Sequence, residues 1–134
     1  MATEWNKDLE TGNINIDNQH KELFRRFDGL MDACHQRKGK EEVYKVLLFL
    51  GDYVRTHFAM EEELQLGHNY PGYPAHKEQH EGFIEELEKL EQQFKMEGAT
   101  LALVIQTNQS MVSWLINHIN VKDKDLAAYL RVNG

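Results

Sequence analysis

The chain is poor in the residues that interrupt helices or cross-link a fold, with one cysteine and two prolines among 134 residues. A single cysteine, Cys34, excludes an internal disulfide and a metal site built from several thiolates. Because a proline inside a helix breaks it, so few prolines leave room for long helices. No apolar stretch approaches the roughly 20 residues that a membrane-spanning helix needs, so we expect no association with a membrane.

Positive charge is also in deficit, because 15 Lys and Arg stand against 22 Asp and Glu, for a net charge of −7. A surface that binds nucleic acid needs clustered Lys and Arg, so we expect no nucleic-acid partner. The first residues, MATEWNKDLE, have neither the basic flank nor the apolar core of a secretion signal. The expectation is therefore a cytoplasmic protein, and the length suits a single domain over residues 1–134.

Hydrophobic residues recur at three- and four-residue steps, which is typical of amphipathic helices. The pattern predicts an irregular arm over residues 1–17, with Asp17 as the N-cap of the first helix. Helices are predicted over about 18–37, 41–66, 75–97 and 100–120, followed by a short C-terminal helix over about 123–132. Because the connections are short, neighbouring helices should be antiparallel. We therefore predict an all-α fold, an up-down-up-down four-helix bundle.

Ionisable residues interrupt the apolar stripes at positions that should face the core. They are His20, His57, Glu61, His76, His80 and His118. His57 and Glu61 are four residues apart, so they share one helix face, and His76 and His80 repeat that spacing. In an antiparallel bundle, the end of the second helix lies beside the starts of the first and third helices and the end of the fourth. All six side chains should therefore gather at one end.

A metal site explains this gathering better than separate core histidines do. One buried histidine is usually a hydrogen-bonded core residue, and that alternative remains open for each one alone. A buried carboxylate, however, costs several kcal/mol unless it is paired or bound to metal. Imidazole with carboxylate suits iron, zinc, manganese or copper, whereas the lack of thiolates disfavours iron–sulfur clusters and structural zinc. Two metals bridged by carboxylates would use all of these donors.

Four segments of the chain resemble the signature of hemerythrins in order and spacing, most closely that of the bacterial type. The segments are NIDNQHKELF, HFAMEEEL, YPGYPAHKEQHEGF and WLINHINVKDKDL. The resemblance extends from Trp5 to about Leu130. It implies a four-helix bundle that holds two non-heme iron ions joined by an oxo or hydroxo bridge.

The resemblance also implies a ligand for each iron position. The matching residues are His76, His80 and His118 for one iron, His20 and His57 for the other, and Glu61 and Asp123 as bridging carboxylates. Periodicity does not find Asp123, because five residues separate it from His118, or about 140° around an ideal helix. Both can reach one site only if the helix ends or bulges between them. Asp125 is the competing candidate, and the family spacing favours Asp123.

The same resemblance implies what the site does. The protein donors and a solvent bridge fall one bond short of two octahedral irons, which leaves a position open on the iron with His20 and His57. An open position admits an external ligand, and the resemblance implies that O2 binds there as a hydroperoxide. The residues that follow Glu61 in the sequence, Glu62 and Glu63, should turn away from the site and be solvated.

The predicted function is reversible oxygen binding for carriage, storage or scavenging, without catalysis. Oxygen-activating bundle enzymes typically use four Glu and two His, so a histidine-rich set favours holding oxygen over oxidising a substrate. Two alternatives remain open: a di-iron peroxidase or oxidase, and a plain metal-binding protein. The sequence identifies no protein partner.

Overall fold

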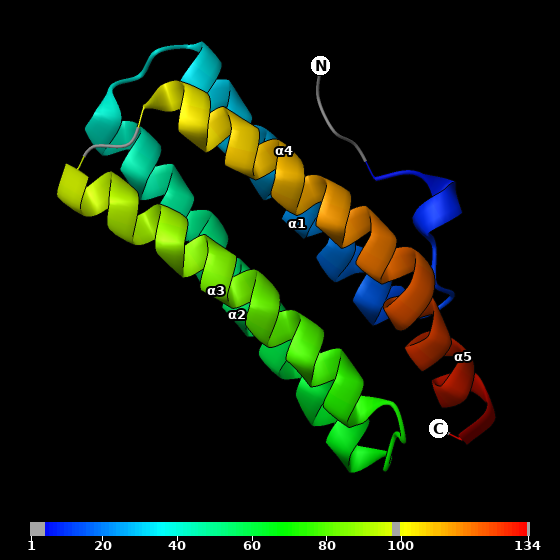
Figure 1. The fold of residues 1–134 in the computed structure, drawn as a ribbon. Helices are drawn as coiled ribbons and strands as arrows, with labels where there is room; N and C mark the ends of the chain where they lie inside the picture. Colours follow the sequence, from blue (N-terminus) through cyan, green and yellow to red (C-terminus); the bar gives the residue numbers. More distant parts are fainter. Residues whose placement is uncertain (1–4, 98–99, 134) are drawn as a thin grey trace.

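The computed structural model describes residues 5–97 and 100–133, and its long elements are all helices (Figure 1). The bundle consists of α1 (Ile14–His35), α2 (Lys40–Gly67), α3 (Tyr73–Glu97) and α4 (Leu101–His118). A short 3-10 helix, η1 (Lys7–Leu9), precedes α1, and a π-helical segment, η2 (Ile119–Asp123), joins α4 to α5 (Lys124–Asn133). In Figure 1, η1, α5 and the α2–α3 turn lie toward the same end. The predicted all-α four-helix bundle is confirmed.

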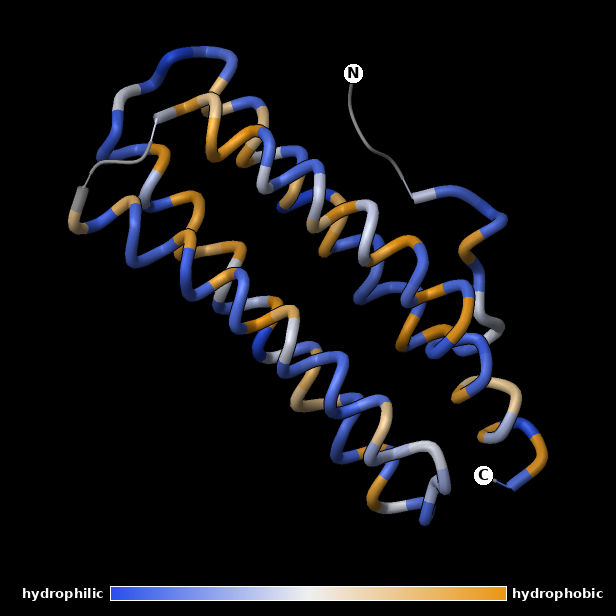
Figure 2. Tube along the Cα trace, viewed as in Figure 1, coloured by the Kyte–Doolittle hydropathy of each residue, from blue (hydrophilic) through white to orange (hydrophobic). Residues whose placement is uncertain are grey.

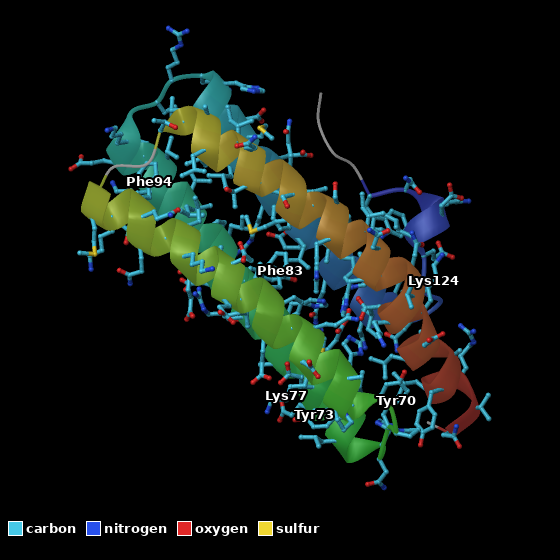
Figure 3. All side chains as sticks on the ribbon, in the orientation of Figure 1. Tyr70, Tyr73, Lys77, Phe83, Phe94 and Lys124 are labelled. Atoms are coloured by element: carbon cyan, nitrogen blue, oxygen red, sulfur yellow. The ribbon has the colours of Figure 1, made fainter. Side chains whose placement is uncertain are left out.

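Each long helix places apolar residues against its neighbours and polar residues on its outer side, so hydropathy alternates along the chain (Figure 2). Leu30 on α1, Leu50 on α2 and Leu87 on α3 have no exposed surface. Phe83 lies among the side chains between the helices (Figure 3). Burial of each such side chain contributes about 1.5–3 kcal/mol. This packing fixes the rotation of every helix, and therefore the direction in which its histidines point.

The first helix begins at Ile14 instead of Asn18, and the prediction of Asp17 as its N-cap was wrong. Asn13 is the N-cap, and its side-chain oxygen accepts hydrogen bonds from two first-turn N–H groups. Asp17 is buried in the first turn and accepts hydrogen bonds from Thr11 N at 2.9 Å and Thr11 Oγ1 at 2.8 Å. The carboxylate therefore ties the arm to the helix.

We expect Asp17→Ala to lower the free energy of unfolding by about 1–3 kcal/mol, because buried donors in the arm would lose their acceptor. Chemical denaturation measures this change. Asn18→Ala alters the next residue, which is exposed, and should stay within about 0.5 kcal/mol of the original chain. Equal losses in the two variants would show that the Asp17 hydrogen bonds do not hold the arm.

The other helices begin and end within about two residues of the predicted bounds, which is the usual spread for helix ends. The main difference is at the end of α4, where the sequence left open a helix end or a bulge between His118 and Asp123, and the structure has the bulge. The backbone remains helical and widens into the π-helical turn η2 before α5 begins. Residues 1–4 of the predicted arm lie outside the described residues. Within the described ranges, no helix combines the length and apolarity needed to span a membrane.

Candidate metal centre

The structure brings the seven predicted site residues together at one end of the bundle. They are His20 from α1, His57 and Glu61 from α2, His76 and His80 from α3, His118 from α4 and Asp123 from η2. None of them is more than 3% exposed. Since they come from five elements, the apolar faces that set the rotation of each helix also build this site.

The atoms that could bind a metal ion form two overlapping groups, each with its atoms within 4.8 Å of one another. The three-histidine group contains His76, His80 and His118, and the two-histidine group contains His20 and His57; Glu61 and Asp123 belong to both. The described residues therefore offer two adjacent sites that share both carboxylates and differ by one imidazole.

Each carboxylate turns one oxygen toward each group. Glu61 Oε2 lies 3.2 Å from His57 Nε2, and its Oε1 lies 3.3 Å from His80 Nε2. Asp123 repeats this arrangement, with Oδ2 2.9 Å from His20 Nε2 and Oδ1 3.0 Å from His76 Nε2. This is the orientation that two bridging carboxylates need.

The π-helical turn η2 places Asp123 in the site. Hydrogen bonds in a π-helix span five residues instead of four, so positions 118 and 123 come to the same face. Asp123 Oδ1 lies 3.4 Å from His118 Nε2 as a result. Asp125, the competing candidate, is exposed and belongs to neither group.

The outer ring nitrogens of most site histidines are held by side chains that the sequence did not indicate. Nδ1 lies 2.6 Å from Gln19 Oε1 in His57, 2.8 Å from Gln79 Oε1 in His118 and 2.9 Å from Glu62 Oε2 in His80. Because amide and carboxylate oxygens accept hydrogen bonds, each Nδ1 donates, and each Nε2 presents a lone pair to the site. The prediction that Glu62 is solvated was wrong, whereas Glu63 is exposed as predicted.

The side-chain amide of Gln65 holds the outer ring nitrogen of His76. Its Nε2 lies 3.0 Å from His76 Nδ1, while its own buried Oε1 has no hydrogen-bond partner. The two ends of a side-chain amide have nearly the same shape. Turning the amide over lets Oε1 accept from His76 Nδ1–H, as at the other histidines.

The inner atoms are arranged for cations. His118 Nε2 lies 2.9 Å from His76 Nε2 and 3.2 Å from His80 Nε2. Nitrogens that bind one ion at right angles, each about 2.1 Å away, are about 3.0 Å apart, whereas facing lone pairs without a cation repel. The carboxylate oxygens of Glu61 and Asp123 also have no hydrogen-bond partner, although they are buried. Buried polar groups are rarely unpaired, so the residues fit a pair of metal ions.

The carboxylates and imidazoles of the site shift one another's pKa values. Burial lowers the pKa of His20, but the charged carboxylates of Asp123 and Glu61 close to its Nε2 outweigh burial and raise it to about 9. Burial and the charge of Glu61 raise the pKa of Asp123, yet the imidazole nitrogens of His118, His20 and His76 close to its oxygens hold it well below its usual range. The carboxylates therefore stay ionised, and protons compete with metal ions for the same donors.

Two aromatic rings fix the plane of the histidines in the three-histidine group. Phe58 stacks on His80 with ring centroids 3.9 Å apart and planes 4° apart. Trp114 stacks on His118 with centroids 4.5 Å apart and planes 11° apart. These contacts, together with the hydrogen bonds at Nδ1, leave each imidazole little freedom to turn its Nε2 away from the site.

We expect Glu62→Ala to weaken metal binding by about 10- to 100-fold, the usual effect of losing a side chain that orients a ligand histidine. Competition with a coloured chelator measures the affinity. Glu63→Ala removes the neighbouring, exposed carboxylate and is the matched control, with an affinity close to that of the original chain. A similar loss in both variants would mean that total charge, and not the hydrogen bond to His80, is responsible.

Comparison with known proteins gives consistent matches over most of the chain. The sequence model of the hemerythrin HHE cation binding domain matches residues 11–130. A bacteriohemerythrin from Pseudomonas aeruginosa strain LESB58 is 36% identical over 121 residues, covering 89% of this chain and 75% of the relative. One from Stenotrophomonas maltophilia strain R551-3 is 33% identical over 131 residues, covering 96% and 82%. A crystal structure of wild-type hemerythrin superposes with a TM-score of 0.88 at 28% identity, covering 96% of this chain and 97% of that one.

Proposed function

This chain belongs to the hemerythrin family, and from that premise we propose that it binds oxygen reversibly at a pair of non-heme iron ions. The observation that carries the proposal is the pair of overlapping donor groups that share Glu61 and Asp123. The proposal covers oxygen carriage, storage or scavenging. The cytoplasm is its proposed location.

The proposed ligands are the seven residues of the two groups. The three-histidine group would hold one ion and the two-histidine group the other, with Glu61 and Asp123 between them. Ferrous ions joined by an oxo or hydroxo bridge would supply the two electrons that reversible oxygen binding requires. Because the two-histidine group offers one imidazole fewer, we propose that oxygen enters on the side of His20 and His57.

The surrounding side chains support holding oxygen over further chemistry. The sequence positions within two helical turns of the ligands carry apolar residues that are at most 2% exposed, namely Phe24, Phe27, Val54, Phe58 and Leu115. All five belong to one core cluster. Such a lining keeps water from the site, and water would otherwise displace the bound ligand.

The test is an anaerobic titration of the iron-loaded, reduced protein with oxygen, followed by visible absorption. We expect a charge-transfer band to form with oxygen and to disappear on purging with argon. Continued oxygen consumption in the presence of a reductant, without a reversible band, would instead support a di-iron oxidase or peroxidase. Iron binding without any oxygen-dependent band would support the remaining alternative, a plain metal-binding protein.

A further inference from the structure

A surface pocket lies beside the three-histidine group, where α3, α4 and η2 meet. Its volume is about 370 Å³, and its lining consists of Gln79, Trp114, Asn117, His118, Val121 and Lys122. The pocket opens between α3 and α4, which pack less closely than the other neighbouring pairs of long helices. Its volume lies within the range of small-molecule sites.

The pocket reaches the metal centre through a single side chain. The ring of His118 has Trp114 stacked on it and Gln79 at its Nδ1, and its Nε2 faces the three-histidine group. A molecule that rests on Trp114 is therefore one imidazole away from the proposed ion. That ion is the one with the full set of imidazoles, so an oxygen molecule entering here would meet no open position. Electrons, in contrast, can pass through the stacked rings.

The lining indicates the kind of molecule that fits. Trp114 is only partly buried and offers an aromatic plane, against which flat conjugated rings stack favourably. Gln79 and Asn117 bring side-chain amides, and Lys122 brings a positive charge. Val121 is 57% exposed and adds an apolar edge. Together these groups suit a planar aromatic ring that carries carbonyl or hydroxyl oxygens.

We propose that this pocket receives a planar two-electron donor of the hydroquinone type, a reduced flavin or a quinol, which returns the oxidised iron pair to the ferrous state through His118. This inference rests on the proposed function. In the step, the reduced ring loses two electrons and two protons and becomes its oxidised form. Each of the two ferric ions takes one electron, and the protons pass to solvent at the mouth of the pocket.

The first test measures binding without redox chemistry. Riboflavin is titrated with the zinc-loaded protein, and flavin fluorescence and anisotropy are followed. We expect saturable binding, with fluorescence quenched by Trp114, and we expect Lys122→Glu and Val121→Glu each to weaken it by about tenfold, or about 1.4 kcal/mol. Lys89→Glu makes the same charge change at an exposed site on α3 and should leave the affinity unchanged. Unsaturable binding, or equal effects of all three variants, would overturn the proposal.

The second test measures electron transfer in the diferric protein by anaerobic stopped flow. Reduced riboflavin should reduce Lys122→Glu about tenfold more slowly than the original chain, while dithionite, whose small radical does not need the pocket, should reduce both at the same rate. Equal rates with riboflavin would overturn the proposal. Displacement of riboflavin by menadione would extend the donor class to quinols, and failure to displace it would restrict the class to flavins. A failed oxygen titration would reject the proposed function, yet saturable riboflavin binding to the zinc form would still support the pocket.

Discussion

Replacement of Glu61 by alanine is expected to abolish the binding of both proposed metal ions. Its two oxygens lie 3.2 Å from His57 Nε2 and 3.3 Å from His80 Nε2, so one side chain serves both groups. Loss of His57 removes a donor from the two-histidine group only. We therefore expect Glu61→Ala to hold no iron after loading and desalting, and His57→Ala to keep the ion of the three-histidine group.

Elemental analysis of the loaded variants measures this difference, and circular dichroism shows whether the helices remain. A variant at a neighbouring exposed position, Glu63→Ala, should retain both ions. Should Glu61→Ala keep one ion with high affinity, Glu61 would belong to one site and the proposal of a carboxylate bridge would fail. If His57→Ala lost both ions, binding at the three-histidine group would require an ion at the two-histidine group.

The apolar periodicity of the sequence was sufficient to predict where most site residues lie. A helix rotates until its apolar stripe is buried, and His20, His57 and His80 occupy positions on those stripes. Each is at most 1% exposed in the structure. Antiparallel order then decides which helix ends meet, so the gathering of the side chains follows from the same pattern that predicts the bundle.

Periodicity could not predict Asp123, because it assumes that the number of residues per helical turn stays constant. The π-helical turn inserts one residue into the hydrogen-bond spacing, and this moves every later side chain around the axis. Spacing alone showed only that a break or bulge was required. The choice of Asp123 came from the resemblance, and the structure places the bulge at η2.

The residues that orient the histidines were missed for a different reason. Glu62 is next to Glu61 and points about 100° away on an ideal helix, which suggests solvent when one helix is considered alone. In the bundle, however, α3 packs beside α2, so Glu62 meets His80 Nδ1 at 2.9 Å. Gln19 and Gln79 each directly precede a site histidine, yet each bonds to a histidine on another helix. Such contacts depend on how helices pair, and a pattern within one helix does not contain that information.

Removal of the metal is expected to lower the melting temperature of the protein by about 15 °C for each ion lost. An ion that binds only the folded chain adds about 4 kcal/mol when its free concentration is about 1,000 times the dissociation constant. At this chain length, each kcal/mol corresponds to roughly 4 °C. Thermal denaturation of metal-free and zinc-loaded protein measures the difference.

The loss of stability on metal removal should be greatest at the end of the bundle where the ions would bind. Asp123 is the only residue of η2 in the two donor groups, so loss of a bound ion would remove a link between the α4–α5 connection and the other helices. What then remains at α5 includes the hydrogen bonds from Tyr129 Oη to His68 O and from Arg131 Nη1 to Thr11 O. We therefore expect faster amide hydrogen exchange in η2 and α5 of the metal-free protein, with little change around Leu50. Glu61→Ala should melt at the same temperature with and without zinc, and a zinc-dependent increase in that variant would mean that zinc still stabilises the chain without Glu61.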